Sequence, residues 1–345
     1  GSPTFRTLVV SGTAPEVETG AGIEDVLLVK FTYDGANVTE WQDGRFFVRN
    51  LDRKVRYSSR QGENVDAWSE GCFATLQAFF LWMAEYGDSG TSEEEKGTVL
   101  VRGTHVLTGT LTVPTDHLQF IGDGEAIIEG GNFTGPLVDV TGRTGVTFRG
   151  VTFGYTGPPV TAAIQGGNLT ADLLVESCLF NGSFPDAVRV NSPGSNAVNI
   201  RVLNCRSILA GTAVNLTGVT SAHIADLVAT GGNSGIGVNL NGCNDTVVTG
   251  CRIADHTNGV NVQANSNRVR VSECALVGCV TGVYVNASQS VLVSNNQVSL
   301  SPVGAADGVF ATGSQSVSVE GNQITTAGSG NYGIRLLGLV TDSKI

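Results

Sequence analysis

A short phrase that returns seven times between residues 173 and 340 constrains the fold of this chain more than any other feature. Each copy holds alternating apolar residues, a turn residue, and a second apolar run led by glycine or alanine. The turn residues stand 22 to 27 positions apart, and they are Cys178, Cys205, Leu227, Cys251, Cys274, Asn296 and Asn322. Such repetition predicts a stacked architecture, in which each unit buries its apolar side chains together with those of the next.

The length of the repeat favours a coil of three strands. A strand rises ~3.3 Å per residue, so a period of roughly 24 residues has room for three short strands and their turns. Val269 and Val271 alternate with polar residues, which is the period-2 pattern of a strand with one buried face. Neither the framework of leucine-rich repeats nor a shorter hexapeptide period is visible. We therefore expect an all-β fold, a right-handed single-stranded parallel β-helix.

Stacking should place like residues in columns. Five glycines and two alanines hold the same place in successive repeats: Ala187, Ala213, Gly237, Gly259, Gly282, Gly308 and Gly333. The six cysteines from Cys178 onward are open to three interpretations, namely disulfides, a metal site, or small buried residues at turns. Parallel side-chain directions oppose a disulfide, and neither a Cys-x-x-Cys pair nor a histidine cluster occurs. We expect free, buried thiols and no metal site.

The chain divides into three segments. Residues 1–60 contain apolar runs separated by Asp-Gly turn signals, which predict a small antiparallel β module. Residues 61–88 are expected to be a linker and a capping helix, and residues 89–345 the β-helix. The last residues resemble the beginning of another coil, so we expect the β-helix to continue beyond Ile345.

One helix is expected, from Asn64 to Gly87. Asp66 or Ser69 would cap its start, and Gly87 stands at the position that follows a helix end. Because this helix is apolar on nearly all sides, it needs a buried place. The open end of the first coil offers one.

Composition narrows the classes of partner. The net charge of −11 argues against nucleic acid, whose binding domains usually carry a basic face. No run of about 18 apolar residues occurs, so no membrane span is expected. No motif in the chain calls for a cofactor.

The stretch from Gly62 to Gly124 carries a resemblance to a known family. It reads GENVDAWSEGCFATLQAFFLWMAEYG and, after a polar loop, GTVLVRGTHVLTGTLTVPTDHLQFIGDG. With the repeats that follow, this layout resembles pectin-lyase-like (pectate-lyase-like) β-helix proteins, above all phage tailspikes and tail fibres. The resemblance covers residues 62–345, although the family's usual linker, DGVTDDT, is replaced by QGENVDAW.

The resemblance implies a homotrimeric adhesin on the virion tail, in an extracellular location, that recognises a host surface polysaccharide or another receptor. Its N-terminal module would contact other virion or tail proteins. Two alternatives stay open. One is a polysaccharide depolymerase, a hydrolase or lyase, with its site between subunits or in coils beyond Ile345. The other is a secreted bacterial carbohydrate-active enzyme.

Glycoside hydrolysis needs two carboxylates about 5 to 9.5 Å apart. Asp255 and Asp307 stand two coils apart on roughly the same edge, with His256 adjacent, and they are the candidates for catalysis. An aspartate before glycine or in a loop is also an ordinary turn residue. Catalysis therefore competes with a purely structural interpretation of these positions.

Carbohydrate binding has its own candidates. Arg268 and Arg270 lie on the outer face of one strand, where they could hold a carboxylated sugar or simply be solvated. Tyr284, Phe310 and Tyr332 offer rings for stacking against sugars, and they are equally compatible with a turn or a subunit interface.

Overall fold

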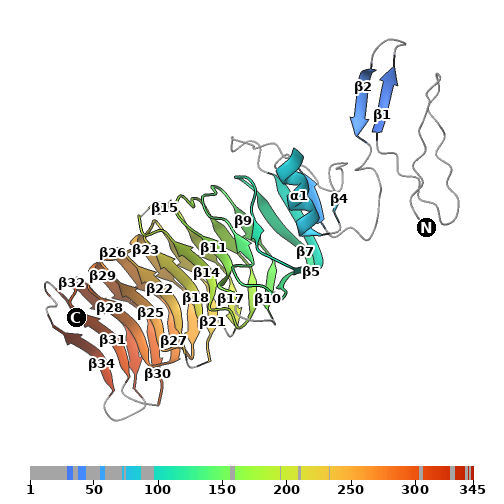
Figure 1. Ribbon diagram of the computed structural model, residues 1–345. Coiled ribbons are helices and arrows are strands. Elements are labelled where there is room, and N and C mark those ends of the chain that lie inside the picture. The colour runs from blue at the N-terminus through green and yellow to red at the C-terminus, as the bar shows by residue number, and fades with distance from the viewer. Residues whose placement is uncertain are drawn as a thin grey trace.

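The computed structural model describes most of the repeat region and a smaller part of the first 96 residues. The described residues are 29–33, 38–43, 55–58, 72–73, 75–86, 97–155, 160–194, 196–208, 211–232, 234–302, 306–326, 331–338, 341 and 343–345. From residue 97 onward they form stacked coils that build an elongated rod (Figure 1).

Each coil contributes one strand to a ten-stranded parallel sheet that forms one side of the rod. Its strands, in spatial order, are β6 (Leu111–Thr112), β8 (Val138–Asp139), β11 (Ala162–Gly166), β14 (Asp186–Asn191), β18 (Thr212–Thr217), β22 (Ile236–Asn241), β25 (Asn258–Gln263), β28 (Thr281–Asn286), β31 (Asp307–Thr312) and β34 (Tyr332–Leu337). Successive coils keep one register, so residues at equivalent positions form columns along the rod.

The other strands of the coils join a 22-stranded sheet, in which the pairing between coils runs along two series. The first series is β9 (Thr147–Arg149), β12 (Leu174–Glu176), β16 (Arg201–Leu203), β20 (His223–Ala225), β23 (Asn244–Thr249), β26 (Asn267–Ser272), β29 (Gln289–Ser294) and β32 (Gln315–Glu320), with short arms β15 (Ala197–Val198) and β19 (Val219–Thr220). The second series is β10 (Thr152–Tyr155), β13 (Leu179–Gly182), β17 (Arg206–Ile208), β21 (Val228–Thr230), β24 (Arg252–Ala254), β27 (Ala275–Cys279), β30 (Gln297–Leu300) and β33 (Gln323–Thr325). The long strands β5 (Thr98–Leu107) and β7 (Gln119–Gly130) begin the sheet.

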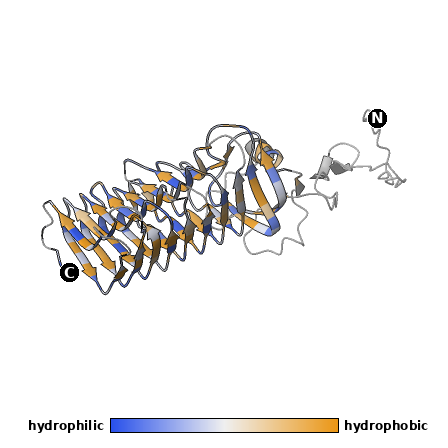
Figure 2. Ribbon diagram, turned by 90° about the horizontal axis from the view of Figure 1, so that it is seen from below, coloured by the Kyte–Doolittle hydropathy of each residue, from blue (hydrophilic) through white to orange (hydrophobic). Residues whose placement is uncertain are grey.

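This architecture confirms the predicted right-handed parallel β-helix. Inward and outward residues alternate along the strands, as the alternating colours of Figure 2 show. Val269 and Val271, for example, are buried, whereas Arg268 and Arg270 between and beside them are exposed. Each coil pairs with the next one, so its backbone donors and acceptors are satisfied between coils.

One corner of the coil depends on residues with positive φ. Eight successive coils place a residue with φ between 51° and 71° at this corner: Gly145, Asp172, Asn199, Ser221, Asp245, Arg268, Ser290 and Ser316. This left-handed conformation turns the chain sharply, and Gly, Asn and Asp tolerate it best. An arginine there is unusual. Arg268 is also held by a bidentate pair with Asp245 of the preceding coil, through Nη2–Oδ2 at 2.7 Å and a shorter Nε–Oδ1 contact of 2.5 Å.

The column of glycines is confirmed, and a close approach of the backbone explains it. A Cβ atom on Gly282 would lie 2.5 Å from the carbonyl oxygen of Gly308 and 2.6 Å from Cγ1 of Val298. Gly237, Gly259 and Gly308 meet the next coil in the same way. The missing side chains leave room for the aliphatic residues that face them across the interior.

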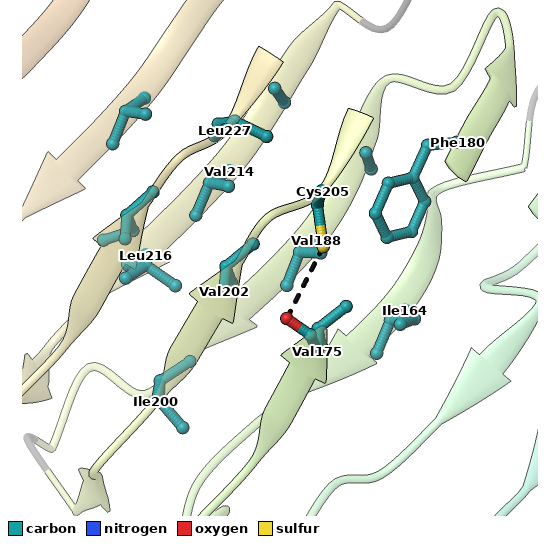
Figure 3. Packing of buried hydrophobic residues seen from close by; sticks show 14 of the residues in the cluster. Ile164, Val175, Phe180, Val188, Ile200, Val202, Cys205, Val214, Leu216 and Leu227 are labelled. Carbon is teal, nitrogen blue, oxygen red and sulfur yellow. Dashed lines mark hydrogen bonds between the residues drawn. The ribbon is translucent and has the colours of Figure 1, made fainter. Parts of the chain in front are cut away.

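The cysteine prediction is also confirmed for the six cysteines whose side chains are described, since all are buried and free. The thiol of Cys205 points toward the carbonyl oxygen of Val175 in the preceding coil, at 3.5 Å (Figure 3). Burial raises the pKa of the Cys279 thiol to about 11. The six buried thiols therefore act as small core residues.

Helix α1 (Leu76–Tyr86) caps the rod, as predicted. Phe79 is fully buried, and the ring of Phe80 lies 5.9 Å from that of Phe120 on β7. Stacked rings of Phe120 and Phe148, 4.9 Å apart, continue this contact into the interior. One side of the helix still faces solvent, because Leu81 is 73% exposed.

The expected start of the helix was wrong. Cys72 and Phe73 form strand β4 (Cys72–Phe73), which pairs with β3 (Val55–Ser58), so the helix cannot run through them. Thr75 caps the helix instead, because its Oγ1 accepts a hydrogen bond from the amide of Ala78 at 3.1 Å. The predicted caps Asp66 and Ser69, like Gly87, lie outside the described residues.

The first 60 residues contain three described strands. β1 (Val29–Tyr33) and β2 (Val38–Asp43) form an antiparallel pair. β3 pairs antiparallel with β5, so it extends the 22-stranded sheet. The division of the chain at residues 60 and 88 stays a prediction. No helix among the described residues is both long and apolar enough to cross a membrane.

Candidate functional site

The outer face of the last three strands of the ten-stranded sheet gathers aromatic and charged side chains. β28, β31 and β34 lie next to one another at the C-terminal end of the rod (Figure 1). Tyr284 and Phe310 are register partners, and their ring centroids lie 5.3 Å apart. Arg335 is the next residue in this column, and its guanidinium lies 4.3 Å from the Phe310 centroid. We call Tyr284, Phe310, Arg335, Asp307 and Tyr332 the aromatic cluster.

Asp307 and Tyr332 form the neighbouring column of the cluster. Asp307 is 7% exposed, and its Oδ2 lies 3.5 Å from Nε of Arg335. Burial raises the pKa of the Asp307 carboxyl, and the nearby guanidinium partly opposes this. Tyr332 is 51% exposed, and its ring centroid lies 5.5 Å from the same guanidinium. The cluster therefore combines ring faces with one compensated ion pair.

The structure brings together four of the predicted site residues, Tyr284, Phe310, Tyr332 and Asp307. Sequence reasoning missed Arg335 and its contact with Phe310. A signal was available, because Arg335 occupies the place in the phrase YGIRL that Tyr284 occupies in TGVYV and Phe310 in DGVFA. Aligning the repeats residue by residue places all three in one column.

Asp255 and His256 lie elsewhere, in the turn between β24 and β25. Asp255 follows β24 with a φ of 57°, and its coil position matches Gly231 and Gly278 of the neighbouring coils. Asp307, by contrast, is in register with Thr281. The two aspartates therefore belong to different columns. The His256 side chain is buried in the rod, with 1% of the residue exposed.

Arg268 and Arg270 lie on the outer face of β26, in the 22-stranded sheet. They are not part of the aromatic cluster. Arg268 is engaged by Asp245, whereas Arg270 has no ion pair among the described residues. Whether they bind a sugar stays a prediction.

No group of three or more His, Cys, Asp and Glu among the described residues has the arrangement of a metal site. The aromatic cluster offers a single carboxylate, Asp307, which Arg335 already pairs. Its ring faces and polar groups are suited to van der Waals contact and hydrogen bonding.

Comparisons with known proteins agree with the fold. The family model described as "Right handed beta helix region" matches residues 136–298 and 186–345, which together make up more than half of the chain. No curated protein sequence matches the chain.

Two solved structures share the fold. A mutant tailspike protein of E. coli bacteriophage HK620, in complex with a pentasaccharide, aligns with a TM-score of 0.60 and 13% identity over 78% of this chain and 57% of its own. The enzymatically active domain of tailspike protein 2 of bacteriophage CBA120 aligns with a TM-score of 0.58 and 12% identity over 70% of this chain and 42% of its own.

The chain thus spans about half the length of these two tailspike structures. At such low identity the likeness concerns the arrangement of the coils, and site residues cannot be transferred. The match of the family model does not depend on the likeness to these two structures, and it covers the repeats that form the rod. This chain belongs to the right-handed β-helix region family.

Proposed function

We propose that the chain is the β-helical part of a virion-associated adhesin, similar to a tailspike or tail fibre, that binds a host surface polysaccharide. The aromatic cluster carries the proposal. Tyr284, Phe310 and Tyr332 offer ring faces on an outer sheet surface, and the C–H face of a sugar ring packs well on such rings. Asp307 and Arg335 beside them supply polar partners for hydroxyl groups.

The rod supports this proposal in a second way. Its single continuous interior makes the outer surface rigid, so the cluster loses little conformational freedom on binding. We propose that three copies assemble side by side and that the N-terminal segment joins them to other virion or tail proteins. Light scattering should give the mass of a trimer in solution, and a monomeric mass would count against the assembly.

Binding is tested on an array of bacterial capsular polysaccharides and lipopolysaccharides. The unaltered protein should bind at least one of them, and Phe310→Ala should weaken that binding tenfold or more, which equals about 1.4 kcal/mol. Leu292→Ala is the matched control, because Leu292 is an outward apolar residue on β29 of the other sheet. Binding that survives Phe310→Ala, or no binding at all, would overturn the proposal.

A depolymerase is the second candidate, and the buried Asp307 favours it, because burial raises the pKa of its carboxyl in the direction that a general acid needs. Asp307 is the only carboxylate on the strands of the ten-stranded sheet from β18 to β34. A hydrolase would need a second carboxylate from another element or another subunit. The depolymerase would be supported if the unaltered protein released reducing ends from a polysaccharide and the double variant Asp255→Asn, Asp307→Asn did not.

A further inference from the structure

A row of amides extends the column of Tyr284 and Phe310 toward the middle of the rod. Asn215, Asn239 and Asn261 are register partners on β18, β22 and β25, and Asn261 is in turn the register partner of Tyr284. Five adjacent strands thus present amides and then aromatic rings in one line. We call these five residues the amide–aromatic track.

The amides of the track are held in one orientation. Nδ2 of Asn261 donates to Oδ1 of Asn239 at 2.7 Å, and Nδ2 of Asn239 donates to Oδ1 of Asn215 at 2.9 Å. Nδ2 of Asn215 donates to both carboxylate oxygens of Asp186 at 3.2 Å. At the other end, Oδ1 of Asn261 is buried and has no hydrogen-bond partner among the described residues. Asn261 as a whole is only 4% exposed, so Asn215 and Asn239 are the half-buried amides of the track that a ligand can reach.

Four of the five strands that carry the track are free of charged residues. β18, β22, β25 and β28 contain no charged residue. In the same four coils, the strands of the 22-stranded sheet carry six charged residues, namely Arg201, Arg206, Asp245, Arg252, Arg268 and Arg270. The chain as a whole has a net charge of −11, so this surface departs from its general character.

An ion pair stands at each end of the track. Nε of Arg189 lies 3.8 Å from Oδ2 of Asp186 on β14, and Nε of Arg335 lies 3.5 Å from Oδ2 of Asp307. Each arginine is therefore compensated by a carboxylate in its own coil or the preceding one. Neither is a free cation that would attract an acidic ligand.

We propose that the track binds an extended, uncharged, hydroxyl-rich glycan that lies parallel to the axis of the rod. Neighbouring strands are ~4.8 Å apart, so the track from Asn215 to Phe310 is about 19 Å long. This inference rests on the proposed function and specifies its ligand class. The half-buried amides of Asn215 and Asn239 donate to and accept from sugar hydroxyls, and the rings contact the sugar at the C-terminal end.

The absence of charge on these strands selects against acidic sugars. A carboxylated sugar laid on the track would lose hydration without gaining a free counter-charge, which is unfavourable. A second copy of this chain is a poorer occupant, because the cores of subunit interfaces are apolar, whereas this surface is rich in amides and threonines.

The test compares neutral and acidic polysaccharides and introduces one charge. Dextran and galactomannan serve as neutral probes and alginate and polygalacturonate as acidic probes, beside the bacterial polysaccharides of the array. We expect binding among the neutral members, and a loss of at least tenfold in affinity in Asn239→Asp. Gln297→Glu, an exposed amide on β30 of the other sheet, is the matched control and should bind normally. Melting temperature and solution mass are recorded for each variant.

The outcomes separate this inference from the proposed function. Binding confined to acidic polysaccharides, or unchanged affinity in Asn239→Asp, overturns the inference and leaves a glycan-binding adhesin. A changed solution mass in Asn239→Asp overturns it in favour of an interface between copies. No binding of any polysaccharide by the unaltered protein overturns the proposed function itself. If Asn239→Asp does not fold, Asn241→Asp is used, because it adds a charge to the same strand outside the track.

Discussion

In the coils of β18, β22, β25 and β28, the ten-stranded sheet and the 22-stranded sheet bury their inner side chains in one interior. Their outward side chains differ in almost every respect. On the ten-stranded sheet, β18, β22, β25 and β28 present asparagine, threonine, glutamine and tyrosine and no charge. On the 22-stranded sheet, the same coils present arginines, an aspartate and a histidine. Both faces bury valine, leucine and isoleucine on their inner sides.

This difference shows which residues specify the fold and which do not. The inward residues and the corner residues repeat from coil to coil because every coil must bury its side chains in one shared interior. Outward residues are free of that demand. A run of four strands without charge on one face is therefore not a requirement of folding, and it agrees with the proposed binding of an uncharged glycan on this face.

The largest expected effect comes from breaking the interior that both faces share. Phe148→Ala removes a fully buried ring that stacks on Phe120 and meets Phe153 edge-on. We expect a loss of about 3 to 5 kcal/mol in the free energy of unfolding. Denaturant unfolding with hydrogen exchange would measure it. If the amides of one sheet lost their protection against hydrogen exchange while those of the other kept it fully, the two sheets would not share one interior.

The next effect concerns the close approach of neighbouring coils at the glycine column. Gly282→Ala places a Cβ 2.5 Å from the carbonyl oxygen of Gly308, so the coils must separate or the strand must shift. We expect a cost of about 1 to 3 kcal/mol in thermal or denaturant unfolding. Gly333→Ala is the control from the same column, because a Cβ there meets nothing within 4 Å. Equal effects of the two substitutions would contradict this explanation.

Acid should lower the free energy of unfolding through His256, which lies in the turn between β24 and β25. Burial lowers the pKa of His256 below the ordinary value of 6.5, and a hydrogen bond with the backbone of Ser234 and the charge of nearby Asp255 partly oppose this. The folded protein then binds fewer protons than the unfolded chain, so the free energy of unfolding should be constant above pH 6.5 and fall as the pH drops below it. Urea unfolding across this range measures the effect. His256→Gln should flatten the profile below pH 6.5, and an unchanged profile would exclude His256 as its cause.

The smallest effect is expected from the arginines on the outer face of the 22-stranded sheet. Arg268→Ala breaks an exposed ion pair, and Arg270→Ala removes an outward side chain of the same strand. Exposed pairs add little to stability. We expect nearly unchanged melting temperatures and unchanged glycan binding in both variants. A tenfold loss of affinity in either variant would place the binding surface on the 22-stranded sheet instead.

Most of the fold was predictable from the sequence, because the repeat length and the alternating valines follow directly from the geometry of a coil. The stacked thiols and the glycine column were predictable for the same reason. The start of helix α1 was not, because the apolar run continues through Cys72 and Phe73. Only their pairing with the distant strand β3 shows that they are extended.

The candidate site was predictable in part. The repeated phrase placed Tyr284 and Asp307 on neighbouring coils, and the register of β28 with β31 accounts for their proximity to Phe310. Arg335 and the amide row were not predicted, because contacts between outward side chains depend on the register of neighbouring coils. Sequence could not show that His256 is buried, since this depends on the path of the turn between β24 and β25.

A crystal structure of the protein with an oligosaccharide from a polysaccharide that it binds would show directly which outer face holds the glycan. We expect the sugar to lie along the outer face of the ten-stranded sheet, over Asn239, Tyr284 and Phe310, parallel to the axis of the rod. A sugar bound to the outer face of the 22-stranded sheet, around Arg268 and Arg270, would contradict this expectation.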